Sequence, residues 1–391
     1  MTEGKRPDTV LTHAGRHPHD FFGVVNTPVF RASTILSRTV AERLAPKGPR
    51  DPAYGRRGTP TMFTLEDAVA EIEGAEGAVI CPSGMAAVAL GYSSMLSAGD
   101  HVLVADCVYA PARRYATEAL PRHGIGATFF DPGIGAGIAE LMRPETKLVY
   151  LEAPGSQTFE MQDVPAIAEA AHARGARVAI DNTWATPLYF KPFDHGVDIS
   201  IHAATKYIVG HSDAMLGIVT CRDAESLKLV RAWWNMTGLC AGPDDIYLGT
   251  RGIRTMSVRL ARHQENAMRV ATWLQGRPEV ERVLYPALPD DPGHAIWKRD
   301  FTGASGLFGL LLNPASPEAV AAMLDGLELF GMGSSWGGFE SLIVPSDPSA
   351  WRTATVWNPA GPLLRLHIGL EDPEDLIADL EAGFARLRAA G

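Results

Sequence analysis

Short apolar runs and amphipathic stretches alternate between residues 65 and 218 of this 391-residue chain. Residues 65–73 have the periodicity of a helix and precede an apolar run at 78–81. Further apolar runs of strand length, mostly flanked by Gly, Pro, Asp or Asn, lie at 101–105, 147–151, 177–180 and 198–201. This alternation predicts an α/β fold with a largely parallel sheet, in which functional loops lie at the carboxyl ends of the strands.

One strand, helix and strand unit is well defined. Residues 164–174 have helical periodicity and are followed by Gly175, a residue type that commonly ends a helix. The apolar run after it leads directly to Asp181. We therefore expect Asp181 to lie at the end of a buried strand.

The pattern changes after residue 252. A long polar helix is predicted at 255–274, followed by a Pro/Gly-rich stretch at 277–293, strands, and a final helix at 373–388. The first ~60 residues have little periodicity and are rich in Pro, Gly and Arg, which is typical of an arm that packs on something else. The predicted parts are an N-terminal arm (1–58), a large α/β domain (59–252) and a smaller C-terminal α/β domain (253–391).

Composition excludes several classes of function. The chain is 46% hydrophobic and 20% charged, and its net charge of −10, without a Lys/Arg block, argues against nucleic acid as a partner. Residues 1–10 are polar, and no apolar run approaches the ~20 residues that span a bilayer, so we expect a cytoplasmic protein without a membrane partner. The cysteines have no CxxC spacing and are expected to be small buried residues rather than disulfides or metal ligands; they are Cys81, Cys107, Cys221 and Cys240.

Three groups of residues at predicted strand ends have chemical potential. The first is Ser83-Gly84-Met85, which precedes the helix-like stretch 86–95. A glycine there lets backbone N–H groups at a helix start approach the oxygens of a phosphate. A simple tight turn is the alternative interpretation.

The second and third groups are Asp181 and Lys206. A carboxylate that ends the apolar run 178–180 requires a partner, such as a protonated ring nitrogen, an arginine or a helix terminus, and a helix N-cap is the alternative. Lys206 lies among small neighbours in the stretch 202–207, where desolvation lowers the pKa of an amine as Schiff-base chemistry requires. A single lysine, by contrast, is commonly a surface residue.

The combination of these groups indicates one cofactor. A phosphate cradle, a carboxylate for a pyridinium nitrogen and a lysine for an aldehyde match the three functional groups of pyridoxal phosphate. The sequence therefore predicts a pyridoxal 5′-phosphate enzyme without a metal.

Two other motifs have a formal likeness to known functional patterns. Residues 333–337 match the GxSxG pattern of serine hydrolases and are followed by Asp347 and His367, in the order Ser, Asp, His. That motif needs a strand before the serine and a helix after it, whereas residues 339–344 have the pattern of a strand that Pro345 soon interrupts. The glycines of residues 133–137 lack the GxGxxG spacing and predict a flexible turn.

The chain resembles the Cys/Met-metabolism family of pyridoxal-phosphate enzymes over nearly its whole length. The most specific stretch is residues 181–217, DNTWATPLYFKPFDHGVDISIHAATKYIVGHSDAMLG, which is similar to the family's cofactor-lysine signature and has β-lyase character. Supporting stretches are YGRRGT at 54–59, SWGGFES at 335–341 and LRLHIGLE at 364–371. The resemblance implies the aspartate aminotransferase type of fold (fold type I), with residues 59–252 as the cofactor-binding domain.

The resemblance also implies a role for each matched residue around the cofactor. Lys206 would carry the cofactor as a Schiff base, Asp181 would pair with the pyridinium nitrogen, and Tyr109 would stack on the ring. The positions that would hold the phosphate are Gly84, Met85 and Thr205, joined by Tyr54 and Arg56 from a neighbouring subunit. The active site would then require an oligomer, and the family likeness favours a homotetramer built as a dimer of dimers.

Substrate contacts follow from the same resemblance. Arg365 would bind the substrate α-carboxylate through its bidentate guanidinium group, and the remaining expected contacts are Ser335, Trp336 and Tyr54. Three positions depart from the family pattern and leave the preferred thioether open. They are Ala203, where many members outside the β-lyases have Ser, Ser334, where a β-lyase can carry Tyr, and Arg114, where an acidic residue can contact the distal end of the substrate.

The expected activity is cleavage of the carbon–sulfur bond of a small amino-acid thioether. With L-cystathionine, removal of the Cα proton by Lys206 or Tyr109 and loss of the thiolate from Cβ would give homocysteine, pyruvate and ammonia, a step of methionine biosynthesis. Alternatives in the same class are a cysteine desulfhydrase and a cystathionine or methionine γ-lyase. An alternative of another class is a non-catalytic protein that senses pyridoxal phosphate or contacts a regulator.

Overall fold

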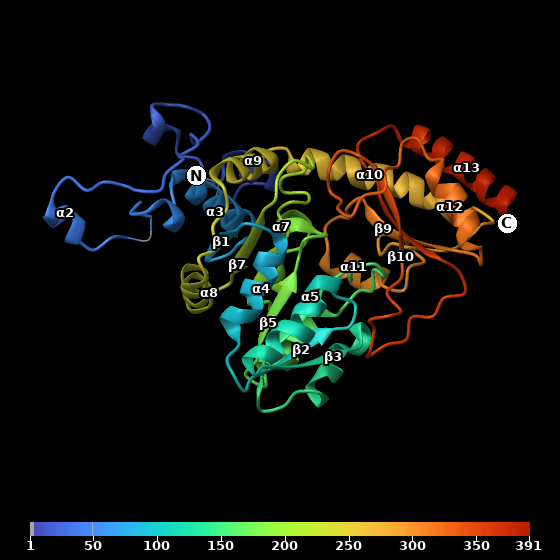
Figure 1. Ribbon diagram of the computed structural model, residues 1–391, viewed down its shortest axis with the longest axis horizontal. Helices are drawn as coiled ribbons and strands as arrows, with labels where there is room; N and C mark the ends of the chain where they lie inside the picture. Colours follow the sequence, from blue (N-terminus) through green and yellow to red (C-terminus); the bar gives the residue numbers. More distant parts are fainter. Residues whose placement is uncertain (1–3, 49) are drawn as a thin grey trace.

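Two β-sheets organise the computed structural model, which describes residues 4–48 and 50–391 (Figure 1). The larger sheet has seven strands in the order β1-β7-β6-β5-β4-β2-β3, and only β7 runs against the others. The predicted largely parallel sheet is therefore confirmed. Its strands are β1 (Gly77–Cys81), β2 (His101–Ala105), β3 (Gly126–Phe130), β4 (Thr146–Glu152), β5 (Arg177–Asp181), β6 (Ile199–His202) and β7 (Gly217–Cys221).

All five strands expected in this region are present, but β3 and β7 were not expected. The strand β3 is an edge strand with mostly half-buried residues, so it lacks the continuous apolar run of a central strand. The strand β7 is fully buried, but it follows a long loop rather than a helix because it is antiparallel to both of its neighbours. Neither strand therefore fits the simple alternation seen in the sequence.

Helices pack on the large sheet and connect its strands. The helix predicted at 65–73 starts earlier, at Pro60, because proline is accepted in the first turn of a helix, and the helix predicted at 164–174 ends at His172. The glycine-rich stretch that was expected to be a flexible turn lies in 3-10 helical structure at Pro132–Glu140, with a break at Gly135. The α-helices of this part are α3 (Pro60–Glu73), α4 (Gly84–Met95), α5 (Ala110–Arg114), α6 (Val164–His172), α7 (Thr186–Tyr189), α8 (Ala224–Thr237) and α9 (Pro243–Ile253).

The second sheet is antiparallel, has the strand order β10-β11-β9-β8, and lies in the C-terminal part of the chain. Helix α10 (Met256–Gln275) runs from the region of α9 into this part, where α12 and α13 pack on each other (Figure 1). The predicted helices at 255–274 and 373–388 are both present. The remaining elements are β8 (Val280–Leu284), β9 (Leu307–Leu312), β10 (Leu342–Ser346), β11 (Leu363–His367), α11 (His294–Asp300), α12 (Pro317–Asp325) and α13 (Pro373–Ala390).

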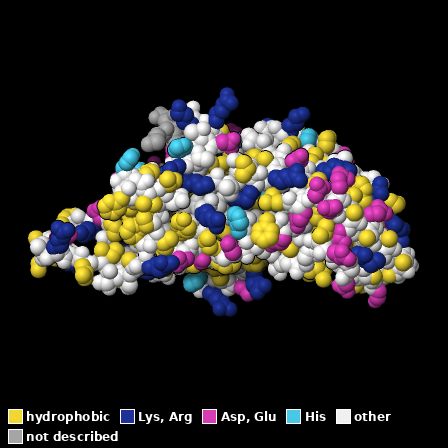
Figure 2. Space-filling view, turned by 90° about the horizontal axis from the view of Figure 1, so that it is seen from above, with side chains coloured by type: hydrophobic (Ala, Val, Ile, Leu, Met, Phe, Trp, Pro, Cys, Tyr) yellow, Lys and Arg dark blue, Asp and Glu magenta, His cyan; other side chains and the backbone are white. Residues whose placement is uncertain are grey.

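The N-terminal segment has two different parts. Helix α1 (Pro7–His13) packs against α3 and α10 of its own chain and buries Leu11. The following residues project away from the body, with α2 (Val40–Leu44) at the far end (Figure 1). Hydrophobic side chains gather on the body beside this projecting segment (Figure 2). The segment itself exposes the hydrophobic side chains of Phe22, Val24, Val25, Leu36, Val40 and Leu44.

The expectation about the cysteines can be compared with the structure. Three of the four cysteines are buried, but Cys240 is exposed, because it lies in the loop between α8 and α9, so that prediction was wrong for this residue. Within the described residues, no group of His, Cys, Asp and Glu side chains is arranged to hold a metal ion, and no helix is long and apolar enough to cross a membrane.

A buried polar network fixes the strand ends that carry the candidate site. Glu73, at the end of α3, has a fully buried side chain that pairs with His202 of β6 at 2.8 Å. Burial alone would raise the pKa of Glu73, but the pairing with His202 and several hydrogen bonds hold this pKa below its usual value. The other donors to Glu73 are Asn182, Ser200 and Thr220. This network joins the ends of β5 and β6 to α3.

We expect Glu73→Ala to lower the free energy of unfolding by about 3–5 kcal/mol, because it leaves buried donors and a buried imidazole without their acceptor. Guanidinium unfolding of the cofactor-free protein, followed by circular dichroism, measures this loss. Glu71→Ala is the matched control, since Glu71 is exposed on the same helix, and it should change stability by no more than about 0.5 kcal/mol. Equal losses in the two variants would contradict the structural role of the network.

Candidate active site

A cavity of about 360 Å³ lies where the two parts of the chain meet, at the carboxyl ends of β1, β5 and β6. This position follows from the general rule that loops at the carboxyl ends of parallel strands form the binding crevice. Nine of the eleven residues proposed from the sequence line it, and Tyr54 and Arg56 do not. The lining residues that were proposed are Gly84, Met85, Tyr109, Asp181, Thr205, Lys206, Ser335, Trp336 and Arg365.

One end of the cavity is suited to an anion. Helix α4 begins there, and Ser83 caps it by accepting a hydrogen bond from the N–H of Ala86 at 3.1 Å. In the described part of the chain, the N–H groups of Gly84 and Met85 have no acceptor. A Cβ at residue 84 would lie 2.5 Å from the Cβ of Ala203, so only glycine lets the loop and the helix approach each other this closely. Two free N–H groups at a helix start fit a phosphate group.

Thr205 is in the cavity wall, but its hydroxyl group is already engaged. It accepts a hydrogen bond from the N–H of Leu216 at 2.8 Å and lies 3.1 Å from the carbonyl oxygen of the same residue. To donate to a phosphate, the hydroxyl proton must turn away from this carbonyl. Ala203 offers only a methyl group at this end of the cavity.

Asp181 is at the carboxyl end of β5 and is 7% exposed. Its Oδ1 accepts hydrogen bonds from both the N–H and the hydroxyl group of Thr183. Burial raises the pKa of Asp181, while the bonds from Thr183 and the nearby His202 and Lys206 act in the opposite direction. A carboxylate buried in this way is stabilised by a cationic partner in the cavity, and a protonated pyridine nitrogen is such a partner.

Lys206 follows β6, and its Nζ donates a hydrogen bond to the Oγ of Ser335 at 2.7 Å. The same Nζ lies 5.4 Å from the ring centre of Trp336. Burial, with a smaller effect from Arg365, lowers the pKa of Lys206 to about 8. This amine therefore has a substantial neutral fraction near neutral pH, which reaction with an aldehyde requires.

Tyr109 and Arg365 line the same cavity from opposite parts of the chain. Tyr109 is 43% exposed, and its backbone N–H donates to the Oε2 of Glu152 at 2.6 Å. Arg365 is on β11, and its Nη2 donates to the carbonyl oxygens of Gly333 and Ser335. These bonds fix the direction of the guanidinium group toward the cavity, which suits the binding of a carboxylate.

Several cavity residues were not proposed from the sequence. The most informative is Glu152, which is paired with Asp181 across β4 and β5, and burial together with Asp181 raises its pKa well above the usual value. The available signal in the sequence was an acid directly after the apolar run at 147–151. Two further wall residues, Gln157 and Phe159, have positive φ angles of 71° and 56°, which non-glycine residues rarely adopt.

Three positions lie away from this chain's own cavity. Tyr54 and Arg56 belong to the projecting segment, where Arg56 donates to the carbonyl oxygen of Asn235. Arg114 is exposed and does not line the cavity. None of these three residues lines the cavity of this chain. Of the other two departures from the family pattern, both Ala203 and Ser334 are in the cavity wall.

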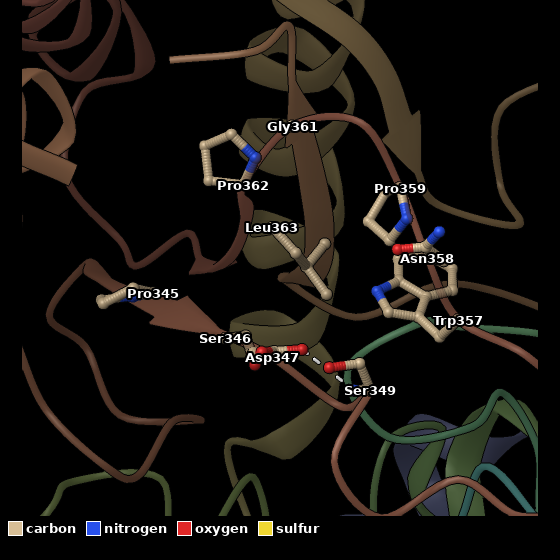
Figure 3. Close-up of a pocket in the computed structure, with 10 residues that line it drawn as sticks. All are labelled: Pro345, Ser346, Asp347, Ser349, Trp357, Asn358, Pro359, Gly361, Pro362 and Leu363. Atoms are coloured by element: carbon tan, nitrogen blue, oxygen red, sulfur yellow. Dashed lines mark hydrogen bonds between the residues drawn. The ribbon is translucent and has the colours of Figure 1, made fainter. Parts of the chain in front are cut away.

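The serine hydrolase interpretation is excluded by the hydrogen bonds of its proposed members. Both ring nitrogens of His367 are bonded to backbone groups, and the Oγ of Ser335 accepts from Lys206. Asp347 lies in a separate cavity of about 470 Å³ and accepts a hydrogen bond from Ser349 (Figure 3). That second cavity contains no other ionisable side chain and has none of the three groups that a pyridoxal-phosphate site needs.

Comparisons with known proteins agree with this geometry. The model of the family described as "Cys/Met metabolism PLP-dependent enzyme" matches residues 8–385. The cystathionine beta-lyase of Escherichia coli K12 is 45% identical, with 98% of this chain and 99% of that protein covered. An L-alanine/L-glutamate racemase of Wolbachia pipientis is 41% identical, with 98% of each covered. The crystal structure of a cystathionine gamma synthase from Xanthomonas oryzae in complex with cystathionine has a TM-score of 0.90 and 34% identity, with 99% of each chain covered.

The pKa of Lys206 leads to a prediction about cofactor capture. Only the neutral amine reacts with an aldehyde, and with a pKa of about 8 the neutral fraction rises about tenfold between pH 7 and pH 9. When pyridoxal phosphate is added to cofactor-free protein, we expect the visible band of the lysine-bound cofactor to form at a rate that follows this rise. Stopped-flow absorbance measures it. A midpoint near the ordinary lysine value of about 10.4 would contradict the assigned environment.

Proposed function

The chain belongs to the family of Cys/Met metabolism PLP-dependent enzymes, and we propose that it is a carbon–sulfur lyase that cleaves L-cystathionine by β-elimination to homocysteine, pyruvate and ammonia. The observation that carries this proposal is the convergence of Lys206, Asp181 and Arg365 on one cavity, at one end of which the start of α4 is suited to an anion. Relatives such as the Escherichia coli protein are named cystathionine beta-lyases, and these residues suit the reaction of such an enzyme.

The residues present fit pyridoxal phosphate. We propose that the N–H groups of Gly84 and Met85 bind its phosphate, that Asp181 keeps its ring nitrogen protonated, and that Lys206 binds its aldehyde carbon. When bound, the cofactor stabilises negative charge at the substrate Cα. Thr205 would join the phosphate site after the rotation of its hydroxyl proton described above.

Arg365 is placed to bind and orient the substrate. One nitrogen of its guanidinium group is fixed by backbone carbonyls, so the side chain is held in position before a carboxylate arrives. We propose that it binds the α-carboxylate, with Ser335 and Trp336 forming the adjoining wall. This contact would direct the Cα proton toward Lys206.

Lys206 is the better candidate for the proton transfer at Cα. Its pKa of about 8 allows Nζ to accept the Cα proton and then to return it to the departing sulfur near neutral pH. Burial, with Glu152 and Asp181 acting in the same direction, raises the pKa of Tyr109, so its hydroxyl group stays protonated. We therefore assign the base to Lys206 and ring stacking to Tyr109.

The projecting N-terminal segment supports an oligomeric enzyme. Tyr54 and Arg56 lie on this segment, outside the cavity of their own chain, and the segment exposes many hydrophobic side chains. We propose that this arm, residues 1–58, reaches the cavity of a neighbouring subunit in a homotetramer and supplies both residues there, including the substrate contact of Tyr54. Parts of the arm also contact their own chain: helix α1 packs on α3 and α10, Arg31 pairs with Asp244, and Arg56 donates to Asn235. We also propose that a domain boundary lies near residue 252 and that the protein is cytoplasmic.

Racemisation of a small amino acid is a second candidate. The Wolbachia relative is named for this activity and is 41% identical. Racemisation begins with the same removal of the Cα proton, but a proton must return from the opposite face. The protonated hydroxyl group of Tyr109, across the cavity, is a suitable donor. Formation of D-alanine from L-alanine measures the racemase activity. If the protein cleaves cystathionine rapidly but forms no D-alanine, only the lyase activity is supported.

The proposed lyase activity is tested by incubating the cofactor-loaded protein with L-cystathionine. We expect homocysteine and pyruvate in equal amounts, and 2-oxobutyrate with cysteine would instead indicate γ-elimination. Lys206→Ala should lower the rate by at least about a thousandfold, since it removes both the covalent attachment and the base. Lys228→Ala, an exposed lysine on α8, is the control. A fully active Lys206→Ala variant would refute the assignment.

The proposed sharing of sites between subunits gives a separate prediction. Lys206→Ala and Arg56→Ala should each be nearly inactive alone. When the two are mixed and reassembled, half of the dimers are mixed and one of their two sites has both native residues, so activity should recover to about a quarter of the wild-type value. No recovery would show that Arg56 acts on its own chain or not at all.

A further inference from the structure

The loop between Gly331 and Leu342 forms the wall of the cavity that faces Lys206. Its two ends are joined by a backbone bridge, and it carries Ser335 and Trp336. At Gly337 the φ angle is +87°, and a Cβ there would lie 3.0 Å from the Cα of Lys206. The loop therefore presses directly on the backbone of the cofactor lysine, and its position sets the position of Ser335 next to Nζ.

One face of strand β11 holds this loop through two side chains. Arg365 donates to the carbonyl oxygens of Gly333 and Ser335, as described above. Two residues further along the same face, the Nε2 of His367 accepts a hydrogen bond from the N–H of Gly337 at 3.1 Å. The Nδ1 of His367 lies 3.0 Å from the carbonyl oxygen of Glu340.

These two contacts define the state of the imidazole. A backbone N–H can only donate and a carbonyl oxygen can only accept, so His367 must be neutral with its proton on Nδ1. Burial lowers the pKa of His367 well below the usual value, and His263, Arg365 and Lys206 around it act in the same direction. The ring is 1% exposed and packs against Tyr207 and His263, so it has little freedom to turn.

We propose that His367 is a positioning residue for the substrate site, which holds the turn at Gly337 through its unprotonated Nε2 and thereby places Ser335 and Trp336 against Lys206. His367 does not itself line the cavity. The role in substrate binding rests on the function proposed above, whereas the hold on the loop rests on geometry alone. Of the serine, aspartate and histidine pattern in the sequence, Ser335 lines the cavity and His367 supports its loop, so the histidine acts as a support rather than as a base.

Three substitutions separate the two hydrogen bonds of His367. His367→Gln keeps an acceptor near the position of Nε2, His367→Asn keeps a donor near the position of Nδ1 but cannot reach Gly337, and His367→Phe keeps the ring volume and loses both bonds. Gln and Asn carry the same amide group, so the free-energy cost of burying that amide is similar in the two variants. A difference between them therefore reports on the bond to Gly337.

Loop order is the readout that needs neither cofactor turnover nor substrate. Hydrogen exchange of the peptide covering residues 331–341, measured by mass spectrometry in the cofactor-loaded protein, should be at least about tenfold faster in His367→Asn and His367→Phe than in the wild type and His367→Gln. Equal exchange in the Gln and Asn variants would overturn the hold on the loop. If this peptide exchanges slowly in a wild-type protein that does not cleave cystathionine, the proposed function would be overturned, but the hold of His367 on the loop would not.

Steady-state kinetics tests the consequence for the substrate. We expect His367→Asn and His367→Phe to raise KM for L-cystathionine about tenfold or more, with kcat changed less than about threefold, and His367→Gln to stay within about threefold of the wild type. A purely structural role would lower the amount of active enzyme and hence kcat, with KM unchanged. That result, or a His367→Gln variant as impaired as His367→Asn, would overturn the proposal.

Discussion

The cost of burying ionisable side chains is the constraint on which the rest of this site depends. Asp181, Lys206 and Arg365 surround one cavity, and burial shifts the pKa of each toward its neutral form. Asp181 accepts hydrogen bonds from Thr183, Lys206 donates to the hydroxyl oxygen of Ser335, and Arg365 donates to the carbonyl oxygen of Gly333. A cofactor with a phosphate, a pyridinium nitrogen and an aldehyde complements all of them. The surrounding architecture can be understood as the support for this arrangement.

That support comes from both parts of the chain. Asp106, at the end of β2, accepts hydrogen bonds from Arg113 and from the backbone of residues 353–355 in the C-terminal part. The same turn leads to Tyr109, so Tyr109 and the loop that precedes β11, the strand of Arg365, are fixed to a common point. Because fixed dipoles and charges need no reorganisation when a substrate binds, this rigidity favours catalysis over mere binding of the cofactor.

The local signals in the sequence were strong for the site and weaker for the sheet. Lys206, Asp181 and the Gly84 turn follow short buried strands, which apolar runs of four or five residues made visible. The half-buried β3 and the antiparallel β7 did not fit that pattern. Glu152 was also missed, because a single acid after an apolar run gives no sign of its partners. The N-terminal segment was predicted to be an arm, but the packing of its helix α1 on the same chain was not predicted. That packing depends on contacts of Leu11 with helices that are distant in the sequence.

The sequence by itself determined five strands of the large sheet, the candidate residues at their ends and the chemical groups that match pyridoxal phosphate, since these depend on local periodicity and residue type. Only the tertiary structure decided which distant residues share the cavity. Arg365 lies 159 positions after Lys206 and reaches it through the pairing of β11 with β9 and β10. It also decided that His367 is neutral and bound to a turn rather than poised beside a serine. Hydrogen-bond partners and burial, which set the charge of a side chain, are properties of contacts between distant segments, and no local pattern contains them.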